Sequence, residues 1–113
     1  MNEQPLLNAT EARILSLAQE TQFAANGIVS RTLLNTPAAR VVLFGFAAGQ
    51  ELTEHASTRR ALIQILSGQC EFSLEGQSRT MKTGDLLHMP PNTRHAVKAT
   101  EPFSMLLTLL APA

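Results

Sequence analysis

Short runs of alternating or continuous hydrophobic residues, each closed by glycine, proline or a polar turn, dominate the chain from residue 28 onward. Runs of about four to eight such residues between turn signals are typical of β-strands. The pattern predicts strands at Ile28–Leu34, Arg40–Ala47, Ala61–Leu66, Gln69–Leu74, Ser78–Lys82, Leu86–Met89, His95–Ala99 and Phe103–Leu110. About eight strands without a long helical pattern indicate an all-β sandwich or barrel.

The first 27 residues carry a weaker pattern that fits two elements. The apolar residues between Ile14 and Ala18, followed by Phe23, fit one side of a short amphipathic helix. Ile14–Leu17 fits a short strand equally well. Asn26 and Gly27 then form a turn signal, so the segment ends before the first predicted strand.

Three of the predicted strands are hydrophobic on both faces. In the last strand, Met105 and Leu107 share one face, and Leu106, which is also apolar, lies on the other. The predicted strands at 40–47 and 61–66 likewise carry apolar residues on both faces. An antiparallel sheet with one solvated face alternates apolar and polar residues instead. We therefore expect the outer face to be covered by a second copy of the chain, in a homodimer. The alternative is that the N-terminal segment folds over this face.

Composition excludes several classes of partner. Nine basic and nine acidic residues give no net charge, so no nucleic-acid partner and no anionic membrane surface are expected. No apolar run is long enough to span a membrane, and the N-terminus lacks the pattern of a secretory signal. The single cysteine, Cys70, excludes an internal disulfide and is typical of a reducing compartment, so we expect a cytoplasmic protein.

Two glycine-anchored segments place two histidines. The first runs from Gly49 to His55, and the second runs from Gly84 through Pro90 to His95. The histidines are 40 positions apart, which excludes a shared helix turn or a single hairpin. A sheet that folds back on itself brings them together, and two converging imidazoles would form a ligand or metal site.

These segments resemble the two sequence motifs of the cupin family, the RmlC-like jelly-roll class. The first motif, G-x5-H-x-H-x3/4-E-x6-G, and the second, G-x5-P-x-G-x2-H-x3-N, are matched in register by Gly49, His55, Gly68, Gly84, Pro90 and His95. The resemblance implies an antiparallel double-stranded β-helix, or jelly-roll, barrel. It also implies one cupin domain over 1–113, with 1–27 as an N-terminal extension and 28–110 as the barrel. Within the extension, the family favours a short strand over a helix.

The chain departs from the family pattern at the residues that hold metal. Family cupins often bind a divalent metal through three histidines and one glutamate. Here Ser57 stands in place of the second histidine and Ala61 in place of the glutamate, while Asn92 and Ala99 replace the glycine and asparagine of the second motif. The resemblance therefore implies a degenerate site for Zn, Fe, Mn or Ni, with His55 and His95 as its metal ligands. Two imidazoles alone make a weak site.

Three other residues are candidates for the same region, and Cys70 is not. His88 is a candidate third metal ligand, or else a core or interface histidine bonded to the backbone. Ser57 and Gln64 are expected in the ligand pocket, although Gln64 fits a dimer seam equally well. Cys70 alternates with apolar residues and is expected in the core rather than as a nucleophile.

Two functions follow from these expectations. The first is a barrel that binds or senses a small, mostly apolar molecule or an organic acid. The second is a metal-dependent enzyme of the oxygenase, isomerase or decarboxylase type, in which His55 and His95 hold the metal. The missing ligands favour the first, and neither the catalytic residues nor the ligand can be named because one fold serves many functions.

Overall fold

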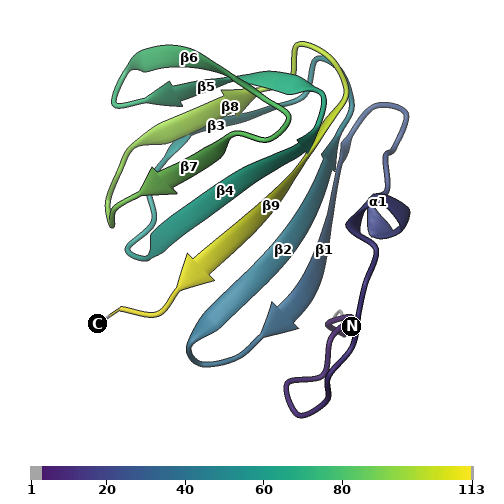
Figure 1. Cartoon of the computed structure of the whole chain (residues 1–113). Helices are drawn as coiled ribbons and strands as arrows, with labels where there is room; N and C mark the ends of the chain where they lie inside the picture. Colours follow the sequence, from purple (N-terminus) through teal and green to yellow (C-terminus); the bar gives the residue numbers. More distant parts are fainter. Residues whose placement is uncertain (1–3, 113) are drawn as a thin grey trace.

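The computed structural model describes residues 4–112, and within them nine strands form two antiparallel sheets that enclose one core (Figure 1). The larger sheet has the order β1-β2-β9-β4-β7, and the smaller has the order β3-β8-β5-β6. The strands are β1 Ile28–Asn35, β2 Ala39–Phe46, β3 Glu51–His55, β4 Arg60–Ser67, β5 Gln69–Leu74, β6 Gln77–Lys82, β7 Leu86–Met89, β8 His95–Lys98 and β9 Phe103–Leu110. This confirms the predicted all-β double-stranded β-helix.

The hydrophobic core lies between the two sheets. Phe46 and Phe103 stack with ring centroids 4.5 Å apart, and both side chains are fully buried. From the smaller sheet, Phe72 and Cys70 point to the same core, because alternate residues of a strand share a face. Cys70 is 0% exposed, which confirms its prediction as a core residue.

The N-terminal segment covers part of the outer face of the larger sheet. It contains one short helix, α1 (Leu17–Glu20), which begins where the side chain of Ser16 accepts a hydrogen bond from the Gln19 N–H. The expected strand at Ile14–Leu17 is wrong, since Ile14 is 96% exposed and lies in no strand. An isolated strand there has no partner ladder, whereas Ser16 supplies a helix cap.

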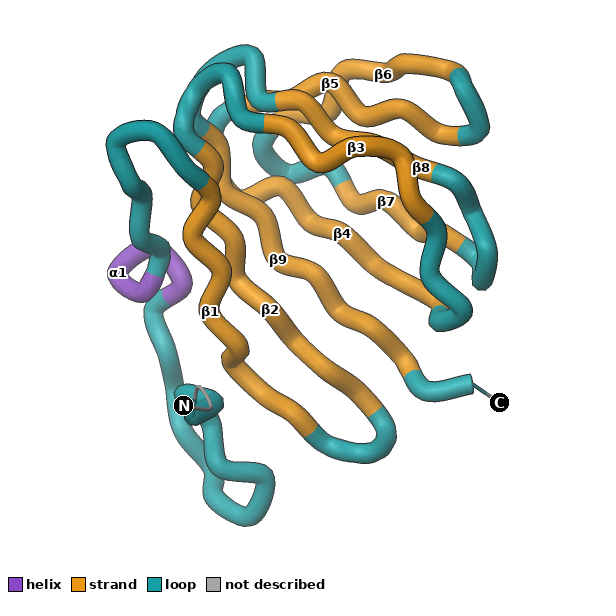
Figure 2. Tube along the Cα trace, turned by 180° about the vertical axis from the view of Figure 1, so that it is seen from behind, coloured by secondary structure: helices purple, strands orange, loops and turns teal. Residues whose placement is uncertain are grey.

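The segment continues along the edge of the sheet. Leu7 N–H donates to the Leu33 carbonyl at 2.7 Å, so the chain adds backbone hydrogen bonds to β1 (Figure 2). The N-terminal segment, which was the alternative to a second copy of the chain, therefore covers the outer face over β1 and β2. Residues 1–3, at the start of the predicted extension, and residue 113 lie outside the described part of the chain.

One strand was missed by the sequence pattern. Strand β3 reads Glu-Leu-Thr-Glu-His, with a single apolar residue, so hydrophobic periodicity gives no signal there. It nevertheless forms the edge of the smaller sheet and pairs with β8. In the described part of the chain, no helix is long and apolar enough to cross a membrane.

Candidate functional site

The structure brings His55 and His95 together on neighbouring strands. They are paired in register, His55 at the end of β3 and His95 at the start of β8. Their ring centroids are 4.2 Å apart and the rings are tilted by 58°. The convergence that the spacing predicted is therefore present in the fold, while the metal and ligand roles of the two residues stay predictions.

An irregularity in β3 turns His55 toward the barrel interior. Leu52 pairs with Val97, and the next pair is His55 with His95, so Thr53 and Glu54 together stand opposite a single residue of β8. This extra residue is a β-bulge, which reverses the alternation of side chains along the strand. In a regular strand, Glu54 rather than His55 would stand opposite His95. The bulge thus decides which residue enters the site.

The loop before β8 is fixed by one hydrogen bond to the first motif and one within the loop itself. Asn92 has a φ of 67°, in the left-handed region that asparagine tolerates better than most residues. Its N–H donates to the Ser57 carbonyl at 2.7 Å, and the Thr93 hydroxyl donates to the Pro90 carbonyl at 2.8 Å. These contacts hold the chain at the position from which His95 enters the barrel.

Both imidazoles are oriented by the same backbone device. His55 Nδ1 lies 2.8 Å from the Thr53 carbonyl oxygen, and His95 Nδ1 lies 2.9 Å from that of Thr93. Because a carbonyl oxygen only accepts hydrogen bonds, each Nδ1 carries the proton of the neutral ring. Each Nε2 is then an unprotonated acceptor that has no hydrogen-bond partner among the described residues and is not fully buried, since His55 is exposed and His95 is half-buried.

The surroundings of His95 favour the neutral ring. Burial lowers the pKa of His95 below its ordinary value of 6.5, the hydrogen bond to Thr93 partly opposes that shift, and the neighbouring His55 adds a smaller lowering. The ring also stacks on Phe72, with centroids 6.0 Å apart and planes 12° apart. The charged imidazolium is therefore disfavoured on this side of the cavity.

The two rings face a small cavity between the sheets. Its volume is about 100 Å³, and its other lining residues are all hydrophobic: Phe44, Leu52, Ile63, Phe72, Val97, Met105 and Leu107. Among residues 4–112, the only polar side chains that line it are His55 and His95. The cavity is thus lined by hydrophobic side chains, apart from two imidazoles whose Nε2 atoms can accept hydrogen bonds.

His88 does not join the pair, which corrects its placement as a candidate third ligand. In β7, Leu87 packs against the core and Met89 is 3% exposed, so His88 points to the opposite, outer face. There its Nε2 lies 2.5 Å from a guanidinium nitrogen of Arg60. The parity of this strand was ambiguous in the sequence because both faces carry leucine.

Neither of the expected pocket residues lines the cavity, which corrects both placements. Gln64 lies on the exposed face of β4, whose buried residues Ile63 and Ile65 point inward. The Ser57 hydroxyl accepts a hydrogen bond from the Arg59 N–H at 3.1 Å, so this side chain closes the loop after β3. The position of Gln64 is compatible with the other expectation for it, a seam between two copies.

Sequence reasoning missed the groups that orient the rings. These groups are the backbone carbonyls of Thr53 and Thr93, each two residues before a histidine. A repeated Thr-x-His pattern marks both places in the sequence. It is a weak signal, because a backbone carbonyl is supplied by any residue type.

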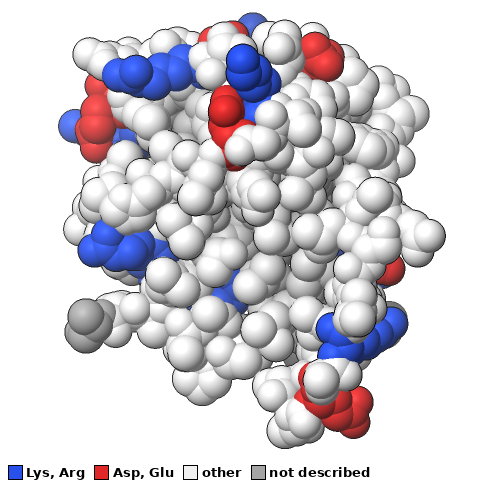
Figure 3. Space-filling model, viewed as in Figure 1, with Lys and Arg blue, Asp and Glu red and all other residues white. Residues whose placement is uncertain are grey.

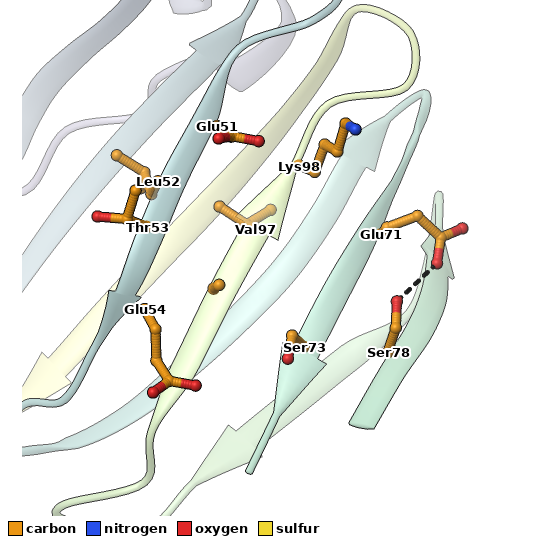
Figure 4. Close-up of a pocket in the computed structure, with 10 residues that line it drawn as sticks. Glu51, Leu52, Thr53, Glu54, Glu71, Ser73, Ser78, Val97 and Lys98 are labelled. Carbon is orange, nitrogen blue, oxygen red and sulfur yellow. Dashed lines mark hydrogen bonds between the residues drawn. The ribbon is translucent and has the colours of Figure 1, made fainter. Parts of the chain in front are cut away.

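A larger hollow lies on the outer face of the smaller sheet, away from both rings. Its volume is about 370 Å³, and Figure 4 shows Glu51, Glu54, Glu71 and Lys98 around it. Glu71 accepts hydrogen bonds from the hydroxyls of Ser78 and Thr80, so it is engaged within the sheet. Glu51 belongs to this outer hollow by its alternation with the inward Leu52, and the bulge places Glu54 there as well rather than in the histidine cavity.

The residues present do not fit the four-ligand metal site of the family. Among residues 4–112, no group of three or more His, Cys, Asp or Glu side chains converges. The cavity offers two imidazole nitrogens, whereas zinc and similar ions take at least three protein ligands in most sites. We therefore derive no chemical step through a metal.

Comparison with known proteins identifies the family of the barrel. The family model described as "Cupin domain" matches residues 42–109, which include both motif segments. No curated protein matches the chain.

Solved structures extend the similarity over almost the whole chain. A conserved protein of unknown function from Streptococcus pyogenes is 31% identical, with 97% of this chain and 96% of that chain covered and a TM-score of 0.84. A cupin superfamily protein from Desulfitobacterium hafniense is 27% identical, with coverage of 96% and 100% and a TM-score of 0.85.

An enzyme shares the fold at lower identity. A salicylate 1,2-dioxygenase from Pseudoaminobacter salicylatoxidans is 17% identical, with 74% of this chain and 26% of that chain covered and a TM-score of 0.70. At this identity the likeness concerns the fold alone.

Proposed function

This chain belongs to the cupin family, and on that premise we propose that its barrel binds a small, mostly apolar molecule beside His55 and His95. The observation that carries the proposal is the cavity itself, in which two imidazoles are the only polar side chains among hydrophobic ones. Ligand sites are commonly apolar, with a few polar groups that fix orientation. This cavity has that composition.

The arrangement supports binding or sensing more directly than catalysis. The two rings are held by backbone carbonyls and so keep fixed acceptor atoms, which suits orientation of a ligand. Among the described residues that line the cavity there is no serine, cysteine, lysine or carboxylate, so the two imidazoles are the only groups there that could transfer a proton. A ligand would therefore be held by shape and by hydrogen bonds to Nε2.

The test of this proposal is an NMR titration with toluene as an apolar probe. Met105 and Leu107 line the cavity and carry methyl groups, whereas Met81 is a core methionine outside the lining. We expect saturable shifts of the Met105 and Leu107 methyl signals and little change at Met81. If the methyl signals of the cavity respond neither to toluene nor to phenol, which has the same ring with a hydroxyl group, up to the solubility limit of each, the proposal fails.

A second candidate is a metal-dependent enzyme that uses His55 and His95 as ligands. It is favoured by the two ring nitrogens that have no hydrogen-bond partner among the described residues. It is disfavoured by the lack of a third ligand, because His88 points to the outer face. Oxygenase, isomerase or decarboxylase chemistry with Zn, Fe, Mn or Ni belongs to this candidate.

Metal analysis of untagged protein separates the two candidates. For the binding barrel we expect less than stoichiometric metal and no thermal shift on addition of Zn, Mn, Fe or Ni salts. Stoichiometric metal that is lost in both His55→Ala and His95→Ala would favour the enzyme instead. His88→Ala is the matched control, since it removes an imidazole that lies outside the cavity.

We further propose that the chain forms a homodimer through the outer face of the larger sheet. Away from the N-terminal segment this face carries Leu62, Leu106 and Leu110, all half-buried, and Leu86 at its edge is 67% exposed. In Figure 3 the middle of the view over this sheet is largely uncharged, and most charged side chains lie toward the rim. These leucines alternate with Gln64, His88 and Thr108 on the same face. A surface that is rich in large apolar side chains and has a charged rim is typical of a protein interface.

A further inference from the structure

We infer that the cavity selects a neutral ligand that donates a hydrogen bond, such as a hydroxyl group on one small ring, and that it disfavours anionic acids. This inference rests on the proposed binding function and narrows it to one class of ligand. It follows from three properties of the cavity, namely its hydrogen-bonding atoms, its lack of a cation, and its size.

The hydrogen-bonding atoms that remain for a ligand are acceptors. Each histidine has one N–H in the neutral ring, and the carbonyl of Thr53 or Thr93 occupies it at 2.8 or 2.9 Å. Each ring therefore presents only the lone pair of Nε2. A ligand hydroxyl or N–H satisfies such a lone pair, whereas a carbonyl, ether or carboxylate oxygen meets a second acceptor.

The cavity also lacks a positive charge that would hold an anion. No lysine or arginine is among its lining residues. The charged neighbours of the two histidines point elsewhere: Glu54 borders the outer hollow (Figure 4), and Arg94 reaches Glu75 with 3.9 Å between Nε and Oε2. A buried carboxylate without a paired cation carries a large desolvation cost. An organic acid bound in the cavity would carry this desolvation cost. Its carboxylate oxygens would also face the lone pairs of the two Nε2 atoms.

The volume limits the ligand to a small body. Apolar cavities of about 150 Å³ are known to take benzene. At about 100 Å³, and with His55 exposed at one side, this cavity has room for one small ring or a short alkyl chain, part of which reaches outward. Phenol is the simplest molecule that combines this size with one hydrogen-bond donor.

The experiment compares three probes of similar shape by methyl NMR titration of the full chain at pH 8. Phenol carries the donor, toluene replaces the hydroxyl with a methyl group, and benzoate carries the anion. We expect phenol to bind at least threefold more tightly than toluene, and benzoate to bind at least threefold more weakly than phenol. Equal affinities for phenol and toluene, or tighter binding of benzoate, would overturn the inference.

Two variants assign the preference to the rings. His95→Phe and His55→Phe each keep a ring of similar shape and remove one acceptor, so we expect the preference for phenol over toluene to shrink in both. His88→Phe is the matched control and should leave the preference unchanged, because His88 lies on the outer face. A preference that survives in both cavity variants would contradict the assignment.

The failure of this inference differs from that of the proposed function. If toluene shifts the Met105 and Leu107 signals but phenol has no advantage, the cavity binds ligands without selecting a donor, and only the inference is wrong. If none of the three probes shifts these signals, the proposed binding function and the inference fail together. The wild-type comparison alone decides between these outcomes, even if one histidine variant does not fold.

Discussion

Cys70 shows how burial sets the reactivity of a single residue. Its side chain is fully buried, and burial together with the nearby Glu71 raises the pKa of the thiol to about 11. Because the thiolate is the reactive form, we expect no reaction with a disulfide reagent such as DTNB at pH 8 in the folded protein, and complete reaction in denaturant. Rapid labelling of the native chain would contradict the burial of this residue.

His95 gives a pH dependence with a definite sign. Its pKa is lowered in the folded chain, chiefly by burial, so between that pKa and the ordinary value of 6.5 the unfolded chain binds more protons. The free energy of unfolding should therefore fall as the pH drops below about 6.5 and level off below the lowered pKa. NMR titration of the ring proton measures the pKa, and His95→Phe should weaken the pH dependence of chemical denaturation. A pKa above 6.5 would show that burial does not dominate.

At the scale of elements, Gly45 decides how closely the N-terminal segment crosses the larger sheet. A Cβ atom at this position would lie 2.1 Å from the Gln22 carbonyl oxygen and 3.3 Å from the Phe23 ring. The nearest group is backbone, so the segment must shift away from β2. We expect Gly45→Ala to lower the free energy of unfolding by about 1–3 kcal/mol.

The matched control for this prediction is Gly27→Ala. At Gly27 an added Cβ would meet only the Ala24 Cβ at 3.6 Å, an ordinary contact. Urea denaturation of the two variants beside the wild type gives the comparison. Equal stability of both variants would mean that the segment does not rest on β2 as closely as the structure has it.

The strands show which elements a hydrophobic pattern in the sequence predicts and which it misses. Strands β5, β7 and β9 have the predicted bounds because glycine, proline or polar turns close their hydrophobic runs. Strand β3 was missed because hydrophobic periodicity needs apolar residues, and it has only Leu52. Its bulge was also beyond prediction, since a bulge depends on pairing with β8 rather than on local sequence.

The candidate site also has features that the sequence predicted and features that it did not. The match of both segments to the cupin motifs implied that His55 and His95 converge, and the structure has their ring centroids 4.2 Å apart. The places of His88 and Gln64 were not predictable from alternation, because their strands carry hydrophobic residues on both faces. Which face of such a strand is the inner one depends on the sheet that packs against it.

At the scale of the whole molecule, the mass of the protein in solution tests whether a second copy of the chain covers the outer face of the larger sheet. We expect sedimentation at micromolar concentration to give about twice the chain mass of 12.2 kDa. Leu62→Glu should shift the protein to monomer, because a dimer would have to remove the added carboxylate from water at the interface. Leu62 lies in the middle of the outer face of β4, between His88 and Thr108 in the ladder.

The control for this test places the same charge on the other sheet. Gln77→Glu adds a carboxylate at an exposed position of β6, and we expect this variant to keep the mass of the wild type. A wild-type chain that sediments as a monomer at these concentrations would overturn the proposed dimer. The N-terminal segment would then be the cover that the chain itself provides, over β1 and β2, and the leucines of β4 and β9 would face solvent.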